Sequence, residues 1–209
     1  MGRGRVSTQC DLKFGPIGAG AFHICVDMQR LFAEDTPWKT PWMGRVLPKV
    51  VELAQVDPSR TIFTRFIPLE NAGQGLGTWK RYYKRWESMT RERLGSDMIG
   101  LMQELAAFVP PAHQLNKFTY SPWYGTDLHA WLHARNAETL IVSGGETEVC
   151  VLSTVLGAID RGYRVVIASD ALCSSSDETH EAMLSVYGQR FSQQIEVVPV
   201  ETIKRNWAG

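Results

Sequence analysis

The 209-residue sequence has only four cysteines, and no two of them form a Cys-x-x-Cys pair. So sparse a set argues against a zinc knuckle or a disulfide scaffold and favours a reducing compartment. No apolar run reaches the length of a signal peptide or a membrane span. The 22 lysines and arginines balance the 22 aspartates and glutamates, so no global field favours nucleic acid. We expect a cytoplasmic protein with no membrane or nucleic-acid partner and with a small-molecule substrate.

Motifs for nucleotides and catalytic metals are also absent. Gly144-Gly145 follows an apolar run as in a dinucleotide-binding unit, but the Gly-x-Gly-x-x-Gly spacing is missing and two bulky residues occupy the turn. His129 and His133 have the spacing of two zinc ligands, yet alanine follows the first where a metalloprotease helix carries glutamate. We expect no cofactor and no metal.

Short apolar runs alternate with segments of helical periodicity along the chain. The runs predict strands at residues 21–26, 61–67, 113–118, 140–143, 164–169 and 195–200. The periodic segments predict helices at 43–53, 79–89, 98–109, 125–135, 147–162 and 177–189. This order is typical of an α/β, three-layer αβα fold with a six-stranded, mainly parallel sheet. We expect one domain over residues 21–209, preceded by an N-terminal arm or a loosely packed entry at 1–20.

Three residues that could take part in catalysis follow the carboxyl ends of predicted strands, where parallel sheets bind ligands. They are Asp27, Lys117 and Cys150. Each alone has an ordinary structural explanation, because aspartate caps turns, lysine is commonly solvated and free cysteine is usually buried as a small apolar residue. Their joint placement indicates a site. Cys150 would lie in the first turn of a helix, where backbone N–H groups and Lys117 would favour the thiolate.

An aromatic and basic segment spans residues 79–86, Trp-Lys-Arg-Tyr-Tyr-Lys-Arg-Trp. Such interleaving occurs in nucleic-acid patches. On a helix, however, Trp79, Tyr83 and Trp86 fall on one stripe and the charges on the other, which is ordinary amphipathic patterning. We expect this segment to pack over the active site or against a partner subunit.

The ordered motifs resemble the isochorismatase-like cysteine hydrolases. The resemblance runs from about residue 21 to the C-terminus. It rests on the strand that ends in Asp27, on Lys117 in Asn-Lys-Phe, and on Gly144-Gly145-Glu146-Thr147-Glu148-Val149-Cys150-Val151. The family includes nicotinamidases, N-carbamoylsarcosine amidohydrolases, ureidoacrylate and biuret hydrolases, and isochorismatase.

The resemblance implies a triad of Asp27, Lys117 and Cys150, with Cys150 as nucleophile, Asp27 as proton carrier and Lys117 as the fixed charge. It also implies an oxyanion site formed by the backbone N–H groups of Glu146 and Cys150, and a cis peptide at Gly145-Glu146. A homodimer or homotetramer would suit the family. Metal-binding members carry Asp-x-His after the second strand, whereas this chain has Thr64-Arg65-Phe66, so no catalytic metal is expected.

These features favour a cysteine-dependent hydrolase that cleaves a C–N bond of a small amide, ureido or carbamoyl compound. Two alternatives stay open, a vinyl ether hydrolase of the isochorismatase type and a non-catalytic binding member of the fold. Trp38, Arg65, Trp79 and Trp123 are candidates for the substrate pocket, with Arg65 able to pair with a substrate carboxylate. Glu146 stands where many members have a small residue, and its role is open.

Overall fold

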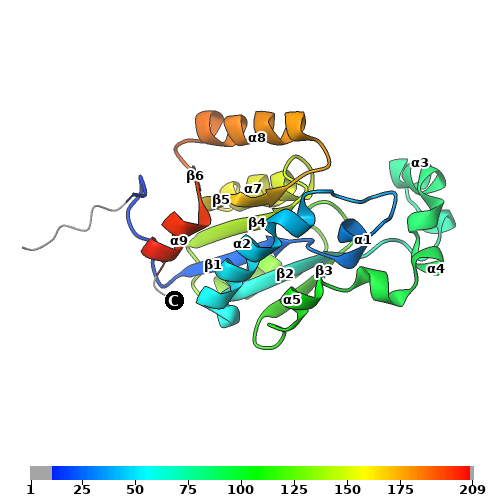
Figure 1. The fold of residues 1–209 in the computed structure, drawn as a ribbon, viewed down its shortest axis with the longest axis horizontal. Coiled ribbons are helices and arrows are strands. Elements are labelled where there is room, and N and C mark those ends of the chain that lie inside the picture. Colours follow the sequence, from blue (N-terminus) through cyan, green and yellow to red (C-terminus); the bar gives the residue numbers. More distant parts are fainter. Residues whose placement is uncertain (1–10, 208–209) are drawn as a thin grey trace, which may run out of the picture.

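The computed structural model describes residues 11–207, which form a six-stranded sheet between two helical layers (Figure 1). The strands are β1 (Ala21–Val26), β2 (Thr61–Phe66), β3 (His113–Lys117), β4 (Thr139–Gly145), β5 (Arg164–Cys173) and β6 (Ile195–Val198). Their spatial order is β3-β2-β1-β4-β5-β6, and every neighbouring pair is parallel. The predicted α/β class and six-stranded sheet are confirmed.

Helices and short 3-10 turns form the connections between the strands. The α-helices are α1 (Arg30–Ala33), α2 (Met43–Val56), α3 (Thr78–Arg85), α4 (Arg91–Leu94), α5 (Gln103–Ala106), α6 (Leu128–His133), α7 (Cys150–Ile159), α8 (Asp177–Arg190) and α9 (Val200–Asn206). Short 3-10 turns are η1 (Pro58–Arg60), η2 (Ala72–Gln74), η3 (Glu87–Met89) and η4 (Ser96–Ile99).

Two hydrophobic cores lie on the two faces of the sheet. Side chains of α2, α5 and α9 form one, and side chains of α6, α7 and α8 form the other. The central strands β1 and β4 are buried along their whole length. This is why they are continuous apolar runs, because a parallel strand covered on both faces has no solvent-facing positions.

The order of strands reverses direction between β1 and β4, which is where open parallel sheets place their ligand site. The chain leaves β1 toward one edge of the sheet and returns to β4 on the other side of β1. The carboxyl ends of both strands point to the end of the molecule that carries α1, α3 and α4 (Figure 1). The fold therefore leaves space beyond the carboxyl ends of β1 and β4, which the segments that carry α1, α3 and α4 can cover.

Two expectations from the sequence are wrong, the helix at 98–109 and the end of the last strand. The segment 98–109 is not one helix, because Gly100 and Met102 pair through their backbones with Arg30 and Met28 and split it into η4 and α5. The last strand ends at Val198, and the unpredicted helix α9 follows it. Part of the expected arm, residues 1–10, lies outside the described residues. In residues 11–20, Leu12 and Ile17 are buried and most of the other residues are exposed.

Candidate active site

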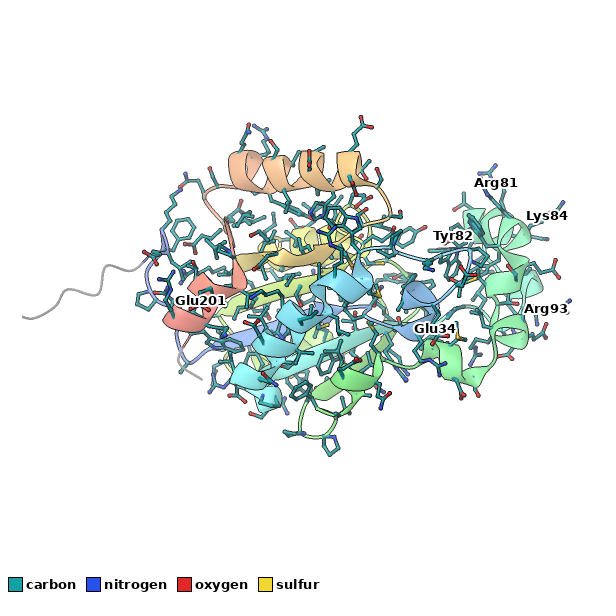
Figure 2. All side chains as sticks on the ribbon, viewed as in Figure 1. Glu34, Arg81, Tyr82, Lys84, Arg93 and Glu201 are labelled. Carbon is teal, nitrogen blue, oxygen red and sulfur yellow. The ribbon has the colours of Figure 1, made fainter. Side chains whose placement is uncertain are left out.

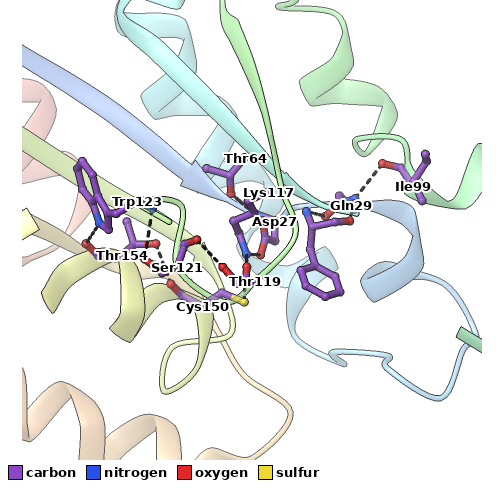
Figure 3. Close-up of polar contacts among 11 residues, drawn as sticks. Asp27, Gln29, Thr64, Ile99, Lys117, Thr119, Ser121, Trp123, Cys150 and Thr154 are labelled. Atoms are coloured by element: carbon purple, nitrogen blue, oxygen red, sulfur yellow. Dashed lines mark hydrogen bonds and ion pairs between the residues drawn. The ribbon is translucent and has the colours of Figure 1, made fainter. Parts of the chain in front are cut away.

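Asp27, Lys117 and Cys150 meet beyond the carboxyl edge of the sheet (Figure 3). Asp27 follows β1, Lys117 ends β3, and Cys150 begins α7 after β4. The Nζ atom of Lys117 lies 2.6 Å from Asp27 Oδ2 and donates a hydrogen bond of 3.4 Å to Cys150 Sγ. Three distant parts of the sequence thus place a carboxylate, an ammonium and a thiol within contact of one another. Their catalytic roles stay predictions.

Asp27 is held in place by Thr64, which sequence reasoning did not single out. The Oγ1 of Thr64 donates to Asp27 Oδ1 at 2.6 Å, and the backbone N–H of Asp27 donates to the same hydroxyl at 3.1 Å. Asp27 also has a φ of 51°, in the region that few residues other than glycine adopt. Its other oxygen, Oδ2, receives no hydrogen bond of acceptable geometry from the described residues. That oxygen is available to accept a proton.

The electrostatics of the triad differ from one expectation. Burial works against the charge of Lys117, but attraction to Asp27 and Cys150 offsets it, and the pKa of Lys117 lies above its ordinary value. Burial raises the pKa of the Cys150 thiol well above its ordinary value, and the opposing pull of Lys117 does not reverse the shift. Burial thus favours the neutral thiol of Cys150 at rest, against the thiolate expected from the sequence, beside the Lys117–Asp27 ion pair.

The turn between β4 and α7 is shaped by its glycines and by contacts with β5. Gly144 has a φ of +103°, and a Cβ there would lie 2.1 Å from the carbonyl oxygen of Val26, so only glycine fits against β1. The peptide Gly145–Glu146 is cis, as the resemblance implied. Thr147 ties the turn to β5, because its Oγ1 donates to the carbonyl of Cys173 at 3.0 Å.

The two N–H groups expected to form an oxyanion site belong to Glu146 and Cys150. Cys150 is the first residue of α7, where an α-helix leaves its N–H groups without internal partners. Neither N–H donates to another group in residues 11–207. Both are thus available to a ligand beside the Cys150 sulfur, and their use as an oxyanion site stays a prediction.

A cavity of about 320 Å³ opens above Cys150. Half of the residues that line it are aromatic, and two charged side chains, Lys39 and Glu146, also line it. The lining residues are Phe32, Pro37, Trp38, Lys39, Phe66, Tyr82, Trp86, Tyr120, Glu146, Val149, Cys150 and Ser175. Its volume suits a small molecule rather than a polymer.

The cavity includes one of the four aromatic or basic candidates, Trp38. Trp38 is the centre of the wall, with ring centroids 6.1 Å from Phe32 and 5.8 Å from Tyr82. Trp79 stands behind the wall, where it packs against Tyr120 at 5.1 Å. The helix α3 does cover this end of the molecule, as one of the two interpretations of the aromatic segment predicted. In Figure 2, Tyr82 points from α3 toward the body of the protein.

Two candidates lie elsewhere. Arg65 neighbours Thr64 on β2 and so points to the opposite face of the sheet, where its guanidinium donates to Asn116 Oδ1 at 2.8 Å. Trp123 packs on α7, and its Nε1 donates to the carbonyl of Thr154 at 2.8 Å (Figure 3). Neither lines the cavity above Cys150. On β2 the residue that does is Phe66, two positions after Thr64.

Gln29 is a second residue that sequence reasoning missed. It is fully buried, and its side chain joins three segments around the triad. Its Oε1 accepts from the N–H of Phe66 at 2.7 Å, and its Nε2 donates to the carbonyls of Phe66 and Ile99 at 3.1 Å and 2.8 Å. A buried amide with every group satisfied fixes the relative positions of these segments.

Within residues 11–207, no helix is long and apolar enough to cross a membrane. In the same part of the chain, no group of three or more histidine, cysteine, aspartate or glutamate side chains is placed to hold a metal ion. His129 and His133 lie on the exposed side of α6, and His129 Nδ1 is 3.1 Å from the hydroxyl of Tyr163.

Comparison with known proteins finds relatives of one family. A family profile described as isochorismatase domain matches residues 21–197. The isochorismatase family protein PncA of Bacillus subtilis is 33% identical over 104 residues, which are 48% of this chain and 57% of that protein. Maleamate amidohydrolase of Pseudomonas putida is 27% identical over 84 residues, 38% of this chain and 39% of that protein. The matched segments thus span about half the length of these relatives or less.

A crystal structure shows the same fold over nearly the whole chain. The structure of a cysteine hydrolase from Pseudomonas syringae pv. phaseolicola superposes with a TM-score of 0.79 at 24% identity. The superposition covers 91% of this chain and 94% of that one. The likeness extends beyond the segments that sequence identity matches.

Proposed function

Because the chain belongs to the isochorismatase family, we propose that it is a cysteine amidohydrolase that cleaves a C–N bond in a small amide, ureido or carbamoyl compound. The observation that carries the proposal is the contact of Lys117 Nζ with both Asp27 Oδ2 and Cys150 Sγ at the base of the cavity. Relatives of the chain include an amidohydrolase.

In the proposed reaction, Cys150 Sγ attacks the carbonyl carbon while Asp27 Oδ2 takes the thiol proton. A neutral resting thiol fits this role for Asp27, since the proton has to be removed as the S–C bond forms. The N–H groups of Glu146 and Cys150 stabilise the oxyanion. Asp27 then returns the proton to the leaving nitrogen, the C–N bond breaks, and a thioester stays on Cys150. Water hydrolyses the thioester with Asp27 as base, giving the acid and the free thiol.

Lys117 keeps its charge through the cycle. Its ammonium balances the carboxylate of Asp27 in the resting state, and the raised pKa keeps it protonated when Asp27 has taken the proton of Cys150. The Lys117 ammonium then faces the negative charge that develops on the Cys150 sulfur. Because this charge exists only during the attack, the contact stabilises the transition state more than the resting state.

The direct test is an ammonia-release screen over small amides and ureides with the wild type, Cys150→Ser and Asp27→Asn. We expect release by the wild type and a loss of at least about 100-fold in each variant. Hydroxylamine added during turnover should trap the acyl group as a hydroxamate. Activity that survives Cys150→Ala but not Asp27→Ala would instead indicate a vinyl ether hydrolase. No release from any amide by folded protein would favour a binding function.

We also propose that the protein acts as a homodimer or homotetramer on a small molecule. Sedimentation equilibrium on the full chain tests the first point, and a monomer at assay concentrations contradicts it.

A further inference from the structure

The carboxylate of Glu146 has no cationic partner. It lines the cavity beside Cys150, and its Oε1 accepts only a long hydrogen bond of 3.2 Å from the N–H of Ser175. Among residues 11–207, no lysine, arginine or histidine forms an ion pair with it. Glu148, two residues on, accepts at its Oε1 from the hydroxyls of Ser174 and Thr179, both at 2.6 Å, and does not line the cavity. Of the two glutamates, Glu146 is the one that a ligand in the cavity can reach.

The other charges near the reacting atoms do not balance the negative charge of Glu146. Asp27 and Lys117 neutralise each other below the cavity. Lys39 also lines the cavity, but its side chain is 46% exposed and lies 3.6 Å from Asp35 Oδ1, so solvent and that carboxylate weaken its field. Of the two charges that line the cavity, that of Glu146 is therefore the less compensated.

The wall that faces Glu146 is suited to a cation. Six aromatic rings line it, those of Phe32, Trp38, Phe66, Tyr82, Trp86 and Tyr120. The face of an aromatic ring attracts positive charge, and aromatic rings around a carboxylate bind ammonium and methylated ammonium groups. The charge of Glu146 reaches Tyr82 and Tyr120, where it adds to the burial that raises both phenol pKa values.

We infer that Glu146 is a specificity-determining residue that selects amides with an ammonium or methylated ammonium group next to the scissile carbonyl. The inference rests on the proposed amidohydrolase function. In that reaction the N–H of Glu146 meets the oxyanion, so its side chain starts beside the carbonyl group. A positive centre one carbon from that carbonyl lies within reach of the carboxylate and the rings. The leaving group is ammonia or an amine, and the products are the ammonio acid and that amine.

Two amides of nearly identical shape separate charge from size. Trimethylammonioacetamide carries a quaternary nitrogen, and its carbon isostere tert-butylacetamide is neutral. We expect kcat/KM for the cationic amide to exceed that for the neutral one by at least about tenfold. In Glu146→Gln, which keeps the shape and the backbone N–H, the ratio should fall by at least about tenfold, to the value set by the inductive effect of the ammonium group on the carbonyl. Glu178→Gln, on the exposed side of α8, is the matched control and should keep the wild-type ratio.

A binding measurement makes the inference independent of turnover. Calorimetric titration of Cys150→Ala with each amide should show at least about tenfold tighter binding of the cation, and Glu146→Gln added to that variant should remove the difference. Equal or tighter binding of the neutral amide overturns the inference, and ammonia release from that amide would leave the proposed function standing. Selective binding of the cation without release from any amide supports the inference and contradicts the proposed function.

Discussion

The ammonium of Lys117 lies 2.6 Å from the carboxylate of Asp27, and neither side chain is exposed to solvent. Each charge is tolerated in the interior because the other balances it. Substitution Lys117→Met should therefore destabilise the protein by about 3–5 kcal/mol, since it leaves a buried carboxylate unpaired. Urea unfolding measures the loss.

The double variant Asp27→Asn/Lys117→Met serves as the control for that prediction. It removes both charges, so we expect it to regain most of the lost stability while releasing no ammonia. Equal destabilisation of the single and double variants would show that the pair is not coupled as the distance implies. Recovery of stability without activity would separate the two roles of these residues.

The buried thiol of Cys150 leads to a second prediction. Because burial raises its pKa above the ordinary value, iodoacetamide should alkylate it at neutral pH more slowly than it alkylates a thiol in a short peptide. The rate should continue to rise as the pH is raised through the alkaline range in which the protein stays folded. Mass spectrometry of peptides that contain Cys150 measures it. A rate that levels off near neutral pH would indicate a resting thiolate.

The positions of the three triad residues could be predicted from the sequence, but their charge states could not. Asp27, Lys117 and Cys150 were predictable because each follows a strand of a parallel sheet, and such ends converge on one edge. Their charge state was not predictable, because burial and charge oppose each other at Cys150. The position of Cys150 at the start of a helix predicts that nearby positive charge lowers its pKa, but it does not show how far burial raises it.

Residues that act through a few hydrogen bonds left no pattern in the sequence. Thr64 lies in β2 and Gln29 follows β1, and only the structure shows that they hold Asp27 and the end of β2. Alternation along β2 carried a usable signal. Because Thr64 faces Asp27, Phe66 on the same face was the better candidate for the cavity than Arg65.

His23 supports a prediction on acid stability. It is fully buried in β1, its Nε2 is 2.8 Å from Ser143 Oγ, and burial lowers its pKa from 6.5 to about 3. Between these values the unfolded chain binds a proton that the folded protein does not. Stability therefore rises with pH across this window and falls on acidification. From pH 6.5 to about pH 5, we expect His23 to contribute a loss of about 2 kcal/mol.

Urea unfolding at several pH values measures this loss. The exposed His133→Gln is the matched control and should keep the full pH dependence, whereas His23→Gln should lose part of it. Since His23→Gln could also weaken folding at every pH, the NMR titration of the His23 imidazole gives a second readout. A ring that titrates near pH 6.5 in the folded protein would contradict the burial argument.

At Gly157 on α7, we expect a glycine-to-alanine substitution to change stability in the direction opposite to the usual one for a helix. Glycine to alanine in a helix ordinarily stabilises by about 0.5–1 kcal/mol. At Gly157, however, a Cβ would lie 2.1 Å from Cδ1 of the Trp123 ring, which packs against the helix here. Gly157→Ala should therefore destabilise the protein by about 1–3 kcal/mol. Gly188→Ala on α8, where nothing lies within 4 Å of the added Cβ, should stabilise it.

The displaced ring links this change to the active site. Trp123 is held by its hydrogen bond to Thr154, and the segment before it carries Lys117 and Tyr120. Pushing the ring away should shift that segment and lower ammonia release more than the loss of folded protein accounts for. Trp123→Leu combined with Gly157→Ala relieves the clash, so the double variant should be more stable than the sum of the two single effects predicts. If the stability changes of the two single variants simply add in the double variant, the Trp123 ring and the Cβ at position 157 do not clash.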